Sequence, residues 1–163
     1  MAKREKLRQF LPVNKQDMLD RDWYCYDILF ITADAYVDHP TFGAAVISRG
    51  LEDAGFRGCM LAQPNWRTVD DFIQFGKPKL GVFISGGNLD SMVAHYTSAK
   101  KRRSEDLYSP GRKTGLRPDR ATIVYANKVR EAFGDIPVVI GGLEASLRRF
   151  AHYDYWEDKV RRS

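Results

Sequence analysis

Short apolar runs, each followed by a loop and a segment with helical spacing, constrain this chain more than any other feature. The clearest run covers residues 25–32, CYDILFIT, and is rich in branched and aromatic side chains. A run of this length and composition is typical of a parallel strand that is buried on both faces. Three further strands are predicted at residues 57–62, 80–84 and 137–140.

Helices are expected before, between and after these strands. Residues 43–54 place Ala44, Ile47 and Leu51 at helical spacing, and a glycine follows as a stop signal. Two shorter helices are predicted to begin at Asn14 and Thr68, because these side chains can accept a hydrogen bond from the first helical turn. The other expected helices lie near residues 89–96, 119–133 and 145–150.

The alternation of strands and helices predicts an α/β fold with a doubly wound, mainly parallel sheet of flavodoxin-like type. Such domains usually have five strands in the order 2-1-3-4-5, and only four are visible here. The sequence stops at HYDYWEDKVRRS without a further strand, so we expect an incomplete fragment with an open sheet edge. The residues expected in buried central strands are Ile28, Phe30, Val82, Ile84, Val138 and Ile140.

The composition indicates one globular domain. The chain has 163 residues, of which 44% are hydrophobic and 29% charged, and this is enough apolar material for a core. The apolar run at 28–31 is far shorter than the roughly 20 residues that a membrane-spanning helix needs, so no membrane contact is expected. We interpret residues 1–22 as an N-terminal arm and residues 23–163 as the α/β domain.

Cysteines and histidines are few and widely spaced. The two cysteines, Cys25 and Cys59, cannot supply the three or four thiolates that an iron–sulfur cluster normally takes, so no metal site is expected in this chain. The basic start, MAKREKLRQF, is not followed by an apolar stretch of signal-peptide length. Together with the free thiols, this predicts a cytoplasmic protein.

The basic charge is concentrated in residues 98–120. The chain carries a net charge of +5, and this segment alone holds eight lysines and arginines against three acidic residues. Two interpretations stay open: a solvated irregular insertion, or a surface that binds RNA, a nucleotide or another anionic partner. Because serines and glycines interrupt the charges, we expect little apolar anchorage and high mobility without a partner.

Candidate binding residues follow the predicted strands, because ligands of parallel sheets bind beyond the carboxyl ends of the strands. These loops offer carboxylates, an imidazole, an amide and glycines that let a ligand approach the backbone. Each loop alone is also explained as a tight turn or a helix cap. Together they predict a shared crevice, with a substrate-binding and not a catalytic role for Asp34, Tyr36, Asp38, His39, Gly86, Gly87, Asn88, Gly141, Gly142 and Glu144.

The end of the chain, residues 148–156, concentrates arginine, histidine and aromatic side chains. Such a mixture is typical of an interface, here a junction between domains. Aromatic and arginine side chains also stack on nucleobases, which is a second interpretation, although no RNP-like signature accompanies them.

Several longer strings resemble one known family. They are DAYVDHPTFG (34–43), AQPNW (62–66), FISGGNLDSMV (83–93), RPDRATIVY (117–125) and GGLEASLRRFAHYDYWEDKVRRS (141–163). In this order they closely resemble the N-terminal region of the YgiQ-type radical SAM proteins, over nearly the whole chain from about Leu11.

The resemblance implies a cobalamin-binding-domain-like region that precedes a radical SAM barrel, which is absent from this chain. In the full-length protein the barrel's CxxxCxxC motif would hold a 4Fe-4S cluster and S-adenosylmethionine. This chain would then be an accessory domain, inactive alone, whose residues 36–43 and 141–146 flank the substrate side of the barrel. The cobalamin pattern DxHxxG is not matched, because Asp38 and His39 are adjacent. The alternative is a stand-alone nucleotide- or RNA-binding module that uses residues 98–120.

Overall fold

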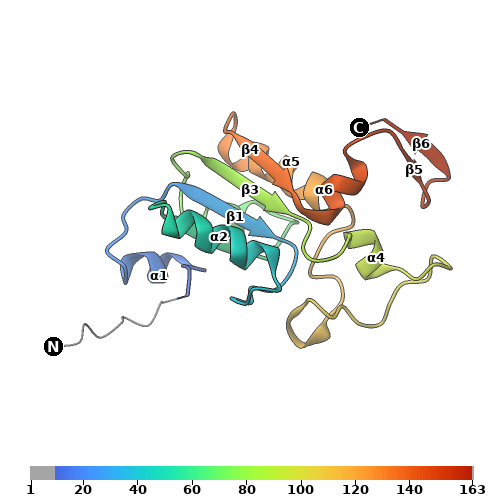
Figure 1. The fold of residues 1–163 in the computed structure, drawn as a ribbon, viewed down its shortest axis with the longest axis horizontal. Coiled ribbons are helices and arrows are strands. Elements are labelled where there is room, and N and C mark those ends of the chain that lie inside the picture. Colours follow the sequence, from blue (N-terminus) through green and yellow to red (C-terminus); the bar gives the residue numbers. More distant parts are fainter. Residues whose placement is uncertain (1–9, 163) are drawn as a thin grey trace.

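A four-stranded, fully parallel sheet forms the centre of the fold, with its strands in the order β2-β1-β3-β4 (Figure 1). The structure is a computed structural model that describes residues 10–162, so residues 1–9 of the expected arm lie outside the described part. The expected doubly wound α/β class is confirmed. The strands are β1 (Ile28–Thr32), β2 (Gly58–Ala62), β3 (Gly81–Ser85) and β4 (Val138–Gly141).

The helices lie close to their expected positions, with two differences. Asn14 caps the first helix as expected, because its side chain accepts a hydrogen bond from the Asp17 N–H at 3.0 Å. Thr68 does not cap the third helix: Val69 is the N-cap, and the loop before it is held by the Asn65 N–H, which donates to Asp71 at 2.7 Å. The last helix begins at Gly142, directly after β4. The helices are α1 (Lys15–Leu19), α2 (Gly43–Asp53), α3 (Asp70–Ile73), α4 (Ser91–His95), α5 (Ala121–Phe133) and α6 (Gly142–Arg148).

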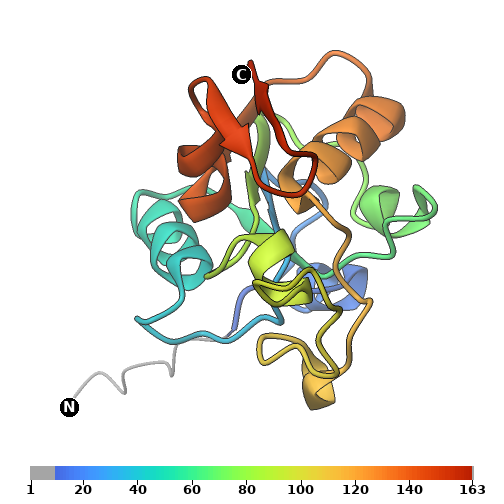
Figure 2. The ribbon, with the colours of Figure 1, turned by 90° about the vertical axis from the view of Figure 1, so that its right-hand side faces the viewer.

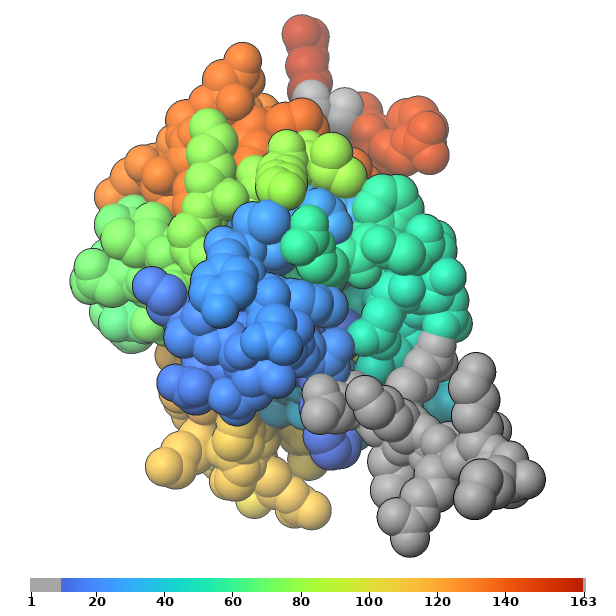
Figure 3. Space-filling view, turned by 90° about the vertical axis from the view of Figure 1, so that its left-hand side faces the viewer, coloured from blue at the N-terminus to red at the C-terminus, as the bar shows by residue number. Residues whose placement is uncertain are grey.

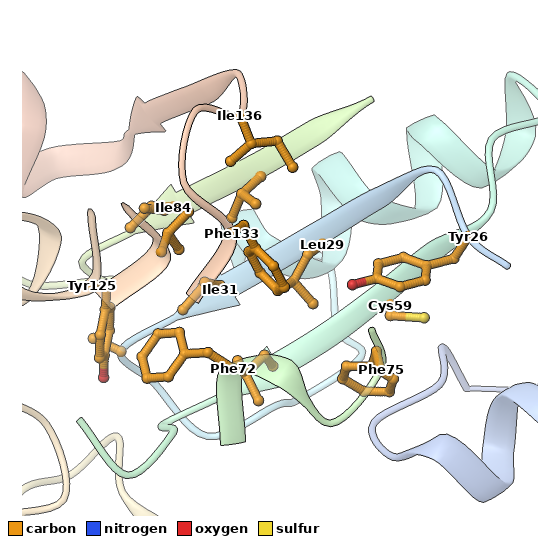
Figure 4. Close-up of a cluster of buried hydrophobic side chains, with 14 of the residues drawn as sticks. Tyr26, Leu29, Ile31, Cys59, Phe72, Phe75, Ile84, Tyr125, Phe133 and Ile136 are labelled. Atoms are coloured by element: carbon orange, nitrogen blue, oxygen red, sulfur yellow. The ribbon is translucent and has the colours of Figure 1, made fainter. Parts of the chain in front are cut away.

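One face of the sheet carries the larger core, shown in Figure 4. Alternate residues of each strand point to this face and contact aromatic side chains of α3 and α5. Burying each of these large apolar side chains contributes about 1.5–3 kcal/mol to folding. The core includes Leu29, Ile31, Val82, Ile84, Phe72, Tyr125 and Phe133.

The opposite face is covered only in part. Here α2 lies in front of the sheet (Figure 1), and Leu11 packs with Phe30 and Met60 over β1 and β2. The register continues this row from Phe30 to Phe83 and from Phe83 to Val139 on β4. Val139 is 53% exposed, so the β3–β4 half of this face is open.

The two edges of the sheet differ. At β2, the arm runs along the outer strand, and the Met60 N–H donates to the Pro12 carbonyl at 2.8 Å. Figure 3 shows the blue surface of the arm and α1 beside the teal surface of α2. At β4, no strand in the described part of the chain pairs on the outer side. Burial of Val138 and Ile140 on both faces was therefore the wrong expectation for this strand, and Ile140 is 46% exposed.

The C-terminal segment is a hairpin of β5 (His152–Asp154) and β6 (Lys159–Arg161), where we expected no further strand. Its turn begins at Asp154, whose carboxylate accepts from the Trp156 N–H at 2.9 Å. The sequence did not indicate these strands because each contains a single apolar or aromatic residue, Tyr153 in β5 and Val160 in β6, and these two lie opposite each other.

The basic segment 98–120 is anchored more firmly than its composition indicated. It contains a short 3-10 helix, η1 (Pro110–Arg112), and it crosses the carboxyl end of the sheet, which faces the viewer in Figure 2. Asp106, Ser109 and Arg117 are buried. The sequence weighed only apolar contacts, and the anchor here is ionic, with Arg117 between Asp34 and Asp106. High mobility without a partner stays a prediction.

Candidate functional site

A cavity of about 370 Å³ lies at the carboxyl end of the sheet, between α2, β3 and the start of α6. Apolar side chains from the open half of the sheet form its floor, and side chains from α2 and α6 form its walls. A cavity of this size and composition is typical of a small-molecule site. The apolar lining comprises Phe30, Phe42, Ile47, Phe83, Val139 and Leu143.

Six of the ten predicted site residues line this cavity. They come from the loops after β1, β3 and β4, which are the three loops that the sequence singled out. The sheet brings them together because the carboxyl ends of its parallel strands share one edge. The six are Asp34, Tyr36, Gly87, Asn88, Gly141 and Gly142.

Asp34 links the first two loops. Its carboxylate accepts a hydrogen bond from the Asn88 N–H at 2.7 Å, and it is 2% exposed. Gly87 stands directly against it with φ +94°, and a Cβ there would collide with both Asp34 oxygens. The close approach of the two loops therefore requires glycine at this position.

Burial raises the pKa of Asp34, although the Asn88 N–H and the Arg117 guanidinium act in the opposite direction. Arg117 is fully buried, with Nη1 at 3.0 Å from Asp34 and Nε at 2.6 Å from Asp106. The pKa of Asp106 is lowered: burial alone would raise it, but the hydrogen bond and charge of Arg117, together with the hydrogen bonds from the Tyr108 N–H and the Ser109 hydroxyl, outweigh burial. This cluster of one arginine and two aspartates ties the basic segment to the loop after β1.

Our sequence reasoning missed the cluster. Arg117 was counted as one more charge of the basic segment, and nothing in its local sequence distinguishes it from the exposed arginines nearby. The apolar lining was missed for a different reason: the doubly wound fold predicted helices over both faces of the sheet, whereas α2 leaves the β3–β4 half of its face open, with Val139 53% exposed.

Tyr36 and Asn88 supply polar groups at the cavity. The Tyr36 hydroxyl accepts a hydrogen bond from the Leu11 N–H at 3.4 Å, and burial raises its pKa. The Asn88 amide donates to the Thr41 carbonyl at 3.5 Å, and Asn88 lines the cavity. Among the described residues that line the cavity there is no histidine, cysteine, lysine or arginine. The arrangement is suited to binding and orienting a ligand.

Asp38 and His39 do not line the cavity. Asp38 forms an ion pair with Arg49 of α2, and His39 is exposed, with Nδ1 at 2.9 Å from the Thr41 hydroxyl. Both residues hold the loop after β1 in place through these contacts, and neither caps α2, whose N-cap Phe42 has no side-chain hydrogen bond.

Glu144 and Gly86 also lie outside the cavity. Glu144 is fully buried and accepts hydrogen bonds from the Ser91 N–H at 2.8 Å and the Thr122 N–H at 3.0 Å. It thus caps the starts of both α4 and α5. A Cβ at Gly86 would lie 2.8 Å from the Glu144 Cβ, so Gly86 makes room for this carboxylate. Glu144 and His39 therefore do not line the cavity together with Asp34. The substrate-binding role of the predicted residues stays a prediction.

The described residues do not fit an iron–sulfur cluster. No group of three or more histidine, cysteine, aspartate or glutamate side chains in residues 10–162 is arranged to hold a metal ion. Cys59 is buried, and burial raises the pKa of its thiol to about 12, which disfavours the thiolate that binds metal. No step of a reaction is therefore assigned to a cofactor within this chain.

The family described as "Radical SAM N-terminal" matches residues 10–163, which is almost the whole chain. The chain belongs to this family. The resemblance seen in its strings is confirmed, and so is the expected assignment to the N-terminal region of such proteins.

Relatives with known names are UPF0313 proteins. One from Clostridium perfringens (strain 13) is 59% identical over 155 residues, which are 95% of this chain and 23% of that protein. One from Clostridium botulinum (strain 657) is 58% identical over 154 residues, 94% of this chain and 24% of that protein. The chain thus spans about a quarter of the length of these relatives. No solved structure matches it.

Among residues 10–162, none of the helices has the length and apolar character needed to cross a membrane.

Proposed function

We propose that this chain is the accessory N-terminal domain of a radical SAM enzyme, and that its cavity lies on the substrate side of a barrel formed by the rest of the protein. The cavity at the carboxyl edge of the sheet carries the proposal, because three separate loops and an apolar floor converge there. The barrel would hold the 4Fe-4S cluster and S-adenosylmethionine that the family implies. The free thiols further support a cytoplasmic location.

The residues of this chain would bind and orient the substrate. The floor of Phe30, Phe83 and Val139 suits an apolar or aromatic part of a ligand, and Tyr36 and Asn88 offer hydrogen bonds at its rim. When bound elsewhere in the protein, the cluster and S-adenosylmethionine would supply the radical chemistry. The cavity would then exclude water from the substrate during that chemistry.

A stand-alone RNA- or nucleotide-binding role for residues 98–120 stays a prediction, and the contacts of this segment favour it less. Arg117 is buried between two aspartates, Arg112 pairs with Glu105, and Arg120 pairs with Asp154 and Glu157. Fewer charges are thus available to phosphates than the composition indicated.

Two glycines of α2 allow a direct test. Gly43 lines the cavity and Gly50 does not, and an added Cβ would meet nothing within 4 Å at either position. In the full-length protein, the Gly43→Leu side chain should fill part of the cavity. Binding of the apolar fluorescent probe anilinonaphthalene sulfonate should then weaken about tenfold, which corresponds to about 1.4 kcal/mol of binding free energy. Gly50→Leu should leave probe binding unchanged.

Iron content and reductive cleavage of S-adenosylmethionine, measured in the same two variants, should match the unmodified protein. Loss of iron in Gly43→Leu alone would show that this region supports the cluster and does not bind the substrate. Equal probe binding by both variants would show that the cavity is not a binding site. A coding sequence without a CxxxCxxC motif after Ser163 would remove the radical SAM barrel from the proposal altogether.

A further inference from the structure

The outer edge of β4, unlike the outer edge of β2, is not covered by another segment in the described part of the chain. The outer edge of β2 is covered by the arm through the hydrogen bond from Met60 to Pro12. Within the described residues, β4 pairs only with β3. An uncovered edge presents unpaired backbone groups that can pair with another strand, and proteins normally protect such edges.

The direction of the free backbone groups follows from the register. The Val82 N–H donates to the Pro137 carbonyl at 2.9 Å, and Val82 lies opposite Val138. In a parallel pair, successive residues point their backbone groups to alternate sides, so the N–H groups of Val138 and Ile140 point away from β3. Both are available to an incoming strand.

The side chains of β4 are apolar on both faces, as is typical of a strand that is covered on both faces. Val139 and Ile140 point to opposite faces and are 53% and 46% exposed. The neighbouring helix α6 adds Leu143 and Leu147, which are 46% and 56% exposed. Edge strands in native proteins often carry charged residues or proline, which discourage pairing with another strand. None of the residues of β4, Val138–Gly141, is charged or a proline.

We propose that β4 pairs with a fifth, parallel strand, which is supplied by the polypeptide that follows this region in the full-length protein. The matched 155 residues are 23% of the Clostridium perfringens relative, so ample chain exists there to supply the strand. Parallel pairing needs a connection of a dozen or more residues, and residues 142–162 already follow β4 as α6 and the hairpin. The resulting order 2-1-3-4-5 is that of the flavodoxin-like fold.

A second copy of the chain fits this edge less well. Two copies related by a twofold axis would pair β4 with β4 in antiparallel orientation over only four residues. Such a short contact would leave the exposed residues of α6 uncovered. The inference concerns the sheet edge and not the cavity, so it can fail while the proposed function holds, and the reverse is also true.

Amide hydrogen exchange in the full-length protein tests the proposal. The Ile140 and Val138 amides should exchange at least about 100-fold more slowly than in an unstructured peptide, because both are hydrogen-bonded to the fifth strand. The Val139 amide, which faces β3, serves as the protected reference. Exchange of Ile140 near the peptide rate would overturn the proposal, and so would protection that disappears on dilution, which indicates a second copy.

A pair of variants separates backbone pairing from side-chain packing. Ile140→Pro removes the outward N–H, whereas Ile140→Ala retains it, and neither change affects a hydrogen bond to β3. In Ile140→Pro the Val138 amide should exchange at least about tenfold faster than in Ile140→Ala. Equal rates in the two variants, with Val139 still protected, would also overturn the proposal. If the proline variant does not fold, exchange in the unmodified protein decides alone.

Discussion

Arg117 is the residue on which the loops around the cavity depend most. Its guanidinium lies between Asp34 and Asp106, and none of the three side chains is more than 3% exposed. Breaking a buried ion pair by removing one partner typically costs about 3–5 kcal/mol, because the remaining charge stays buried without compensation. We expect Arg117→Met to lower the free energy of unfolding by roughly this amount at neutral pH, as measured by urea denaturation.

The loss of unfolding free energy in Arg117→Met should depend on pH in a defined direction. The folded-state pKa of Asp106 is lowered, so this carboxylate stabilises the fold above its unfolded pKa of about 3.9, and the stabilisation is lost as the pH falls through the lower, folded value. The difference between the unmodified protein and Arg117→Met should therefore shrink below about pH 4. Arg112→Met, at an exposed pair in the same segment, should change stability by less than about 1 kcal/mol.

Glu144 shows how a residue predicted to bind substrate can have a structural role. Its carboxylate also accepts from the Thr122 hydroxyl at 2.7 Å, in addition to the two backbone N–H groups of α4 and α5. Glu144→Ala would leave these buried donors unsatisfied, and we expect a loss of about 3 kcal/mol or more in unfolding free energy. Glu131→Ala, which removes an exposed glutamate from α5, should cost less than about 1 kcal/mol. Equal losses would contradict the capping role.

At the scale of elements, the basic segment allows the clearest test of an anionic partner. Lys100, Lys101, Arg102 and Arg103 retain most of the exposed charge, although Arg102 stacks on Tyr96 and Arg103 bonds to backbone carbonyls. If the segment binds RNA, replacing all four with alanine should abolish most of the binding to a single-stranded oligonucleotide, and affinity should fall steeply with salt. Retention on an anionic matrix that the four substitutions leave unchanged would discard the RNA-binding role.

The strands and long helices could be predicted because each depends on local pattern. The stretch at 28–31 is apolar without interruption, and β1, which contains it, is buried at every position. Helix α2 ends where Gly55 follows. What could not be predicted depends on partners distant in sequence: the pairing of Asp34 with Arg117, the capping of α4 and α5 by Glu144, and the hairpin at the end. The loops that line the cavity could be predicted, because each follows a strand. Its apolar floor could not, because how far α2 extends over the sheet depends on packing between distant residues.

At the scale of the whole molecule, the hairpin β5–β6 is attached to the body by polar contacts. Arg120, just before α5, donates to Asp154 at 2.9 Å and to Glu157 at 2.6 Å. The Tyr155 hydroxyl donates to the Ser98 carbonyl at 2.5 Å, and Trp156 stacks against Tyr96 with ring centroids 5.0 Å apart. An attachment of this kind weakens with salt more than an apolar core does.

We therefore expect the hairpin to detach before the sheet unfolds, on adding salt or acid. The pKa of Asp154 is lowered: burial alone would raise it, but the hydrogen bond from Arg120 and the N–H groups of the turn outweigh burial. The attachment is thus present above the unfolded pKa of about 3.9 and is lost as the pH falls through the lower value. Amide exchange in β5 and β6 should accelerate there, and in Arg120→Met it should already be fast at neutral pH. In Arg130→Met, which removes an exposed arginine at the far end of α5, exchange in the hairpin should be unchanged. Exchange that accelerates equally in the hairpin and in β1 would mean that the hairpin and the sheet unfold as one unit.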